Sequence, residues 1–72
     1  MLVLYRGYTI HTAAMRIADD FWNAEVRVRR VRSSEKPYIA VVNCRKSTSE
    51  AAETAALVVT ERWVDRRETE SA

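Results

Sequence analysis

Cys44 could act as a catalytic nucleophile with His11 as its base, and each is the only residue of its type in this sequence. A thiol becomes a catalytic nucleophile when a nearby imidazole takes its proton and a third group orients the imidazole. We expect the two residues on different strands, and no orienting group is evident. A lone cysteine in a strand is usually a small buried hydrophobic residue. We therefore expect no catalytic residues and no enzymatic activity.

Metal and cofactor sites have equally few candidate residues. One histidine and one cysteine do not provide the three or four ligands of a zinc site. Asp19 and Asp20 are typical of the polar tip of a turn. The single glycine, Gly7, stands outside any strand-to-helix junction, so no glycine-rich phosphate loop is predicted. We expect neither a metal nor a cofactor.

The arginines indicate a third kind of chemistry. Residues 1–46 hold nine Lys and Arg against four Asp and Glu, whereas residues 47–72 hold three against six. A basic sheet face attracts phosphates without reading base sequence. The candidate nucleic-acid contacts are Arg27, Arg29, Arg32, Arg45 and Lys46. Cross-strand ion pairs or plain solvation explain the same residues equally well, and no run of exposed aromatic residues is available for base stacking.

Three strands are predicted before residue 47. Residues 22–31 alternate apolar and polar side chains, which is typical of an antiparallel strand with one solvated face. Residues 5–13 are rich in Tyr, Thr and Ile, and Gly7 within them indicates a bulge or bend. Residues 38–44 follow Pro37, and residues 38–42 among them are apolar on both faces. Turns are expected at 15–21 and 33–37.

A helix is predicted over residues 47–67, the only segment with a clear helical period. Ser47 and Glu50 have the spacing of a capping box, and Thr48 or Ser49 could cap instead. One stripe of the helix is predicted to face the core: Ala52, Ala55, Ala56, Val59 and Trp63. Leu57 and Val64 point to the opposite side, where they are candidates for contact with another chain.

These elements predict an α+β fold of β-β-β-α order. Two hairpins give a three-stranded antiparallel meander in the order 1-2-3, and the helix packs on one face. Residues 1–67 form the single domain, and residues 68–72 form a polar, frayed tail. The third strand then lies at an edge, so either Ile39 and Val41 or the alternate set of Tyr38, Ala40 and Val42 stays open to water. Ile39 and Val41 join Leu57 and Val64 as candidates for self-association.

Four short motifs stand out in the sequence, at residues 5–10 (YRGYTI), 21–22 (FW), 49–53 (SEAAE) and 63–65 (WVD). Together they resemble a group of small β-β-β-α proteins of Burkholderia-type bacteria that have no established activity. The resemblance implies a fold and little else. A more distant likeness connects the strand order and Glu50-Ala51 to the HicB antitoxins. The acidic and glycine-containing turns of that family, and its appended DNA-binding segment, have no counterpart in this sequence.

The sequence favours a small protein that works by association, as a homodimer or as an adaptor to another protein. The alternative is a nucleic-acid-binding or antitoxin-like module that uses the basic sheet face. The single cysteine fits a reducing compartment, and no signal peptide or membrane-spanning stretch is evident, so we expect a cytoplasmic protein without a membrane partner.

Overall fold

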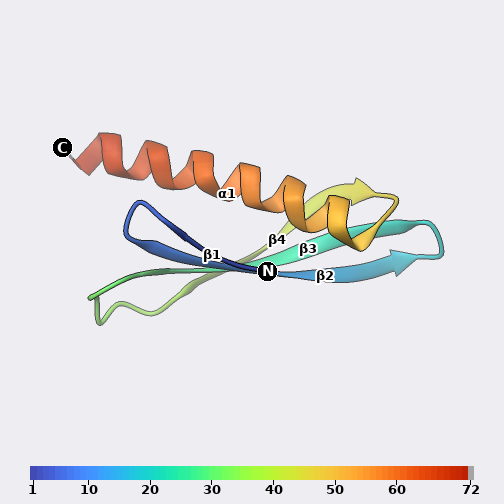
Figure 1. The fold of residues 1–72 in the computed structure, drawn as a ribbon, viewed down its shortest axis with the longest axis horizontal. Coiled ribbons are helices and arrows are strands. Elements are labelled where there is room, and N and C mark those ends of the chain that lie inside the picture. Colours follow the sequence, from blue (N-terminus) through green and yellow to red (C-terminus); the bar gives the residue numbers. More distant parts are fainter. Residues whose placement is uncertain (72) are drawn as a thin grey trace.

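The computed structural model describes residues 1–71, which form one antiparallel sheet and one helix (Figure 1). The elements are β1 (Leu2–Tyr5), β2 (Tyr8–Ala18), β3 (Phe21–Arg30), β4 (Tyr38–Lys46) and α1 (Ser49–Ser71). Each strand pairs with its neighbour in the chain, in the order β1-β2-β3-β4. The α+β class and the C-terminal helix are confirmed, whereas the prediction of three strands is wrong by one strand.

The additional strand arises at Arg6 and Gly7, where a bulge or bend was predicted within one strand. Both residues have positive φ angles, 48° and 82°, and Tyr5 pairs directly with Tyr8 across them. A two-residue turn with positive φ at both positions is the type I′ hairpin turn, which matches the twist of the flanking strands. The chain therefore reverses at this point, and β1 becomes an edge strand.

The β2–β3 hairpin is longer than the sequence indicated. Strand β2 continues to Ala18, although a turn was predicted from Met15 onward, and Asp19 and Asp20 alone connect it to Phe21. The tip of this hairpin extends beyond the first turn of α1 (Figure 1). The helix therefore covers only part of the length of the two central strands.

Helix α1 begins one residue after Thr48, one of the two alternatives to Ser47 as the cap. The Thr48 hydroxyl accepts a hydrogen bond from the Ala51 amide at 3.1 Å, which satisfies one of the unpaired donors of the first turn. The helix continues to Ser71, so residues 68–71, which were predicted to form part of a polar tail after the helix, are helical. Ala72, the last residue of that predicted tail, lies outside the described residues.

The buried stripe of α1 differs from the predicted one. It consists of residues four apart: Ala52, Ala56, Thr60 and Val64. A spacing of four advances the stripe by about 40° per step around a helix of 3.6 residues per turn. The buried face therefore winds around α1 and follows the twist of the sheet. Thr60 is accommodated because its hydroxyl donates to the Ala56 carbonyl at 2.8 Å.

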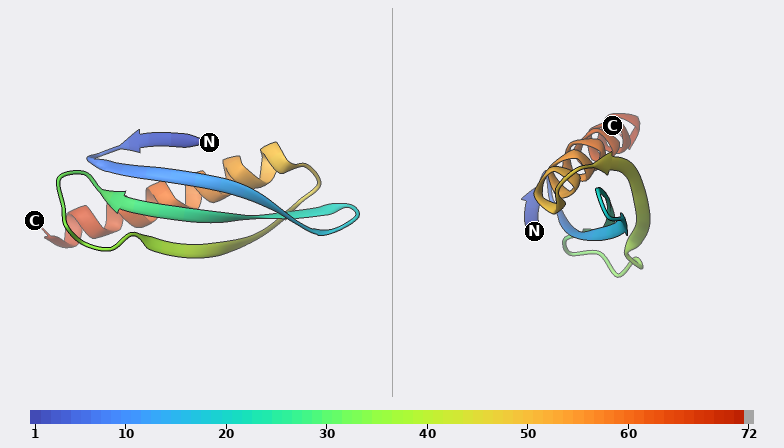
Figure 2. Two further views of the ribbon diagram at one scale, coloured as in Figure 1. Left: turned by 90° about the horizontal axis from the view of Figure 1, so that it is seen from below. Right: turned by 90° about the vertical axis from the view of Figure 1, so that its right-hand side faces the viewer.

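The molecule has two layers, with the strands curling beneath the helix when they are seen end-on (Figure 2). One core cluster consists of Tyr8, Ile10, Val28 and Val64. A second cluster consists of Ala24, Val26, Ala52 and Ala56. The helix lies across β2 and β3 with a smaller contact on β4. Among the described residues, no helix combines the length and the apolar character needed to cross a bilayer.

Two carboxylates of α1 accept hydrogen bonds from β1, β2 and the turn between them, and so hold the helix against this side of the sheet. The Tyr5 hydroxyl and the Arg6 guanidinium donate to Asp65 at 2.8 and 2.7 Å. Both hydrogen bonds lower the pKa of Asp65, and the bond from Arg6 has the larger effect. The pKa of Glu53 is lowered in the same direction, by the Met1 amino group and then by the Thr12 hydroxyl, which donates at 3.0 Å.

Acid should therefore weaken the docking of α1. Because both pKa values are lower in the folded chain, the stabilisation is complete above the pKa of unfolded carboxyls, about 4, and is lost as the pH falls through the folded values. We expect the melting temperature to fall between pH 7 and pH 3, and Asp65→Asn to lower it at pH 7 while making the decline shallower. Glu70→Gln, at an exposed carboxylate on the same helix, is the control. An Asp65→Asn profile as steep as that of the parent would contradict this assignment.

Candidate association site

The two residues considered for nucleophilic chemistry lie on opposite faces of the sheet. His11 is exposed on the face away from α1, between Leu2 and Arg27 on the neighbouring strands. Cys44 faces the helix, and its thiol donates to the Ala52 carbonyl at 3.5 Å. The sheet separates the thiol from the imidazole, so the two side chains cannot exchange a proton directly. Within residues 1–71, no group of three or more potential ligands could hold a metal ion.

The basic candidates divide into two groups. Arg27 and Arg29 project from the outer face of β3, where they pair with His11 and Thr9 on β2. Arg32 lies in the turn just beyond, with a φ angle of 65°. Arg45 and Lys46 lie at the other end of the sheet, where Lys46 pairs with Trp22. The five residues therefore do not form one continuous basic surface.

The four apolar candidates for self-association also fall into two groups, one exposed and one buried or half-buried. Ile39 and Val41 are 53% and 51% exposed on the outer face of β4. Val64, by contrast, is fully buried, and Leu57 is half-buried against the same core cluster. The prediction that Leu57 and Val64 form an outward-facing pair is wrong, because the winding of the buried stripe turns this side of the helix toward β1 and β2.

The free edge of the sheet lies along residues 38–42 of β4. These residues pair regularly with β3, from Tyr38 opposite Val28 to Val42 opposite Ala24. After Val42 the register shifts, and Arg45 takes a φ angle of 48°. Before Tyr38 stands Pro37, which has no N–H to offer. The regular segment of the edge is therefore five residues long, and it contains no charged side chain.

The irregular end of β4 is held by a buried asparagine. The Asn23 side chain donates to Asn43 at 2.9 Å and accepts from the Arg45 amide at 3.1 Å. Both partners come from the irregular segment, so Asn23 satisfies polar groups that the strand ladder does not pair. This arrangement fixes where the regular part of β4 stops.

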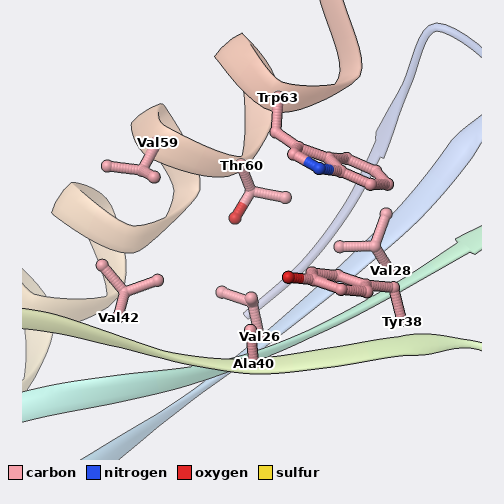
Figure 3. A pocket seen from close by; sticks show the side chains of 8 residues that line it. All are labelled: Val26, Val28, Tyr38, Ala40, Val42, Val59, Thr60 and Trp63. Carbon is pink, nitrogen blue, oxygen red and sulfur yellow. The ribbon is translucent and has the colours of Figure 1, made fainter. Parts of the chain in front are cut away.

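An apolar groove of about 120 Å³ lies between α1 and β4 (Figure 3). Its lining comes from three elements: Val26, Val28, Tyr38, Ala40, Val42, Val59, Thr60 and Trp63. At one end, the Tyr38 ring stacks on the Trp63 ring at a centroid distance of 5.1 Å. At the other end, Ala40, Val42 and Cys44 pack against the core cluster that contains Ala52 and Ala56 of α1. Strand β4 is thus held at its start by the Tyr38–Trp63 stack and farther along by this cluster.

The part of this groove that α1 contributes was not predicted from the sequence. Val59 was assigned to the core, yet it is 49% exposed and lies opposite Val42 across the opening (Figure 3). Val58 is half-exposed beside it, and two adjacent valines cannot both lie on one narrow buried stripe. That adjacency was the available signal that the helix carries apolar residues beyond those the sheet covers.

Comparison with family models, with curated proteins and with solved structures finds no match for this chain. The resemblances drawn from residue motifs therefore stay expectations, and functional inference depends on the surface geometry alone.

Proposed function

We propose that this protein is a non-enzymatic association module that forms a homodimer by pairing β4 with β4 of a second copy. The free edge at residues 38–42 carries this proposal. Soluble proteins usually protect sheet edges with charges, prolines or bulges. In β4, Lys36 and Pro37 stand before the regular segment and the irregular pairing follows it. Between them the backbone edge has none of these protections.

The surroundings of this edge suit an interface. Ile39 and Val41 border it on the outer face, while Tyr38 and Val59 border it on the helix side, and each is about half exposed. A stable interface covers about 800 Å² per partner, about one sixth of the 5135 Å² surface of this chain. The other edge strand, β1, has only four residues, and short edge strands are poorer templates for pairing.

A lysine at position 41 should dissociate the dimer without unfolding it. Val41 points outward beside Glu25 on β3, so a lysine there is tolerated by the fold but places a charge in the apolar surface around the edge. We expect sedimentation to show at least a tenfold weaker dimer, which corresponds to about 1.4 kcal/mol. The matched control is Leu4→Lys on the outer face of β1, which should leave the dimer intact.

The same sedimentation experiment separates the other outcomes. A parent protein that is monomeric at high micromolar concentration would rule out the homodimer, and dissociation by Leu4→Lys alone would move the interface to β1. The nucleic-acid alternative predicts retention on mixed oligonucleotides at about 50 mM salt. If retention occurs and is lost in the double variant Arg27→Ala/Arg29→Ala, the function belongs to the outer face of β3.

A further inference from the structure

We infer that the two β4 strands pair antiparallel about a two-fold axis at Ala40, so that the interface has one defined register. This inference rests on the proposed homodimer and specifies its geometry. A two-fold axis perpendicular to a sheet passes between two directly opposed residues, so one residue of β4 must face its own copy. The structure limits which residue that can be.

The regular segment of β4 runs from Tyr38 to Val42 and is bounded by Pro37 and by the register shift. Its midpoint is Ala40. Only an axis at Ala40 uses all five regular residues in both subunits, with Tyr38 opposite the partner's Val42. Any other centre would pair regular backbone with the proline or with the irregular residues after Val42, and would leave ladder hydrogen bonds unmade.

The side chains agree with this register. On the helix side, Ala40 lies opposite its own copy at the axis, and Tyr38 lies opposite the partner's Val42. On the outer face, Ile39 lies opposite the partner's Val41, and the reciprocal pair lies beside it. Four half-exposed apolar side chains thereby become one continuous patch, and directly opposed β-branched pairs of this kind stabilise sheets.

Single cysteines in a Cys44→Ala background test this register by oxidation with glutathione disulfide. Directly opposed residues have Cα atoms about 4.5–5.5 Å apart, within the range that a disulfide requires. We expect Ala40→Cys to form a disulfide dimer at least tenfold faster than Ile39→Cys or Val41→Cys. The latter two face their own copies only diagonally, at about 7–8 Å. An equimolar mixture of Ile39→Cys and Val41→Cys should cross-link between the two species, which tests the register without touching Ala40.

The outcomes distinguish the register from the dimer itself. Fastest cross-linking by Val41→Cys would overturn the Ala40 register but keep the β4 interface. A sedimenting dimer that cross-links at none of these positions would overturn both the register and the β4 interface. Monomeric Cys44→Ala protein, with a monomeric parent, would remove the proposed function on which the inference rests.

Discussion

Replacing Val64 by aspartate should unfold the protein or bring it to the edge of unfolding. Val64 is completely buried and packs with Tyr8, Ile10 and Val28. An unpaired charge in such a place costs roughly 3–5 kcal/mol. A domain of 72 residues has a free energy of unfolding of only about 4–11 kcal/mol. Urea denaturation followed by circular dichroism measures the loss.

The same substitution at Val58 is the matched control. Val58 lies on the same helix, has the same side chain and is 41% exposed, so its replacement by aspartate should change the free energy of unfolding by less than about 0.5 kcal/mol. The ratio of the two effects reports which side of α1 faces the sheet. A Val64→Asp protein as stable as Val58→Asp would exclude the orientation of the helix described above.

This orientation shows what the helical period could and could not predict. The helical and strand periods were sufficient to predict the helix and its position on one face of the sheet. They also predicted that Ala52 and Ala56 are buried in the core. A straight stripe fails beyond Ala56 because the sheet twists, and the contact face of α1 winds with it. For that reason Thr60 and Val64 are buried in the structure, whereas Val59, which was predicted to be buried, is exposed.

The sheet was predictable wherever apolar and polar side chains alternate. It was less predictable where the backbone conformation determines the position of a turn. The pattern of residues 22–31 located β3 to within one residue at each end. Arg6 and Gly7 form a turn through their positive φ angles, which the residue types alone did not indicate, because arginine is not typical of that position.

The candidate site was predictable in part. The apolar character of residues 38–42 on both faces indicated an unprotected edge, and the structure places Ile39 and Val41 on the open face. The groove was not predictable, because it depends on how far α1 lies from β4. That distance is set by the Tyr38–Trp63 stack at one end and by the alanines at the other.

Replacing Trp63 by alanine should have the second largest effect, because this side chain joins the core to β4. The indole lies edge-on to Tyr8 at 6.4 Å and stacks on Tyr38, so both contacts disappear together. Truncation of a buried tryptophan costs about 3–5 kcal/mol, and we expect the lower end because Trp63 is only partly buried. Trp63→Phe, which keeps a ring in place, should lose less than half as much. Equal losses in the two variants would show that the stacking contributes little.

The Trp63 variant should also change β4 locally and, through it, the proposed dimer. Without the indole, the start of β4 loses the Tyr38 stack on α1, whereas Ala40, Val42 and Cys44 keep their packing against the cluster that contains Ala52 and Ala56. Amide hydrogen exchange should therefore accelerate more at residues 38–39 than at 42–44. A mobile edge strand must be ordered before it can pair, so the proposed β4 dimer should weaken in Trp63→Ala even under conditions where the protein stays folded. If amide exchange accelerated uniformly along β4 and the dimer affinity were unchanged, the groove would have no influence on the interface. Trp63 would then be a purely structural residue.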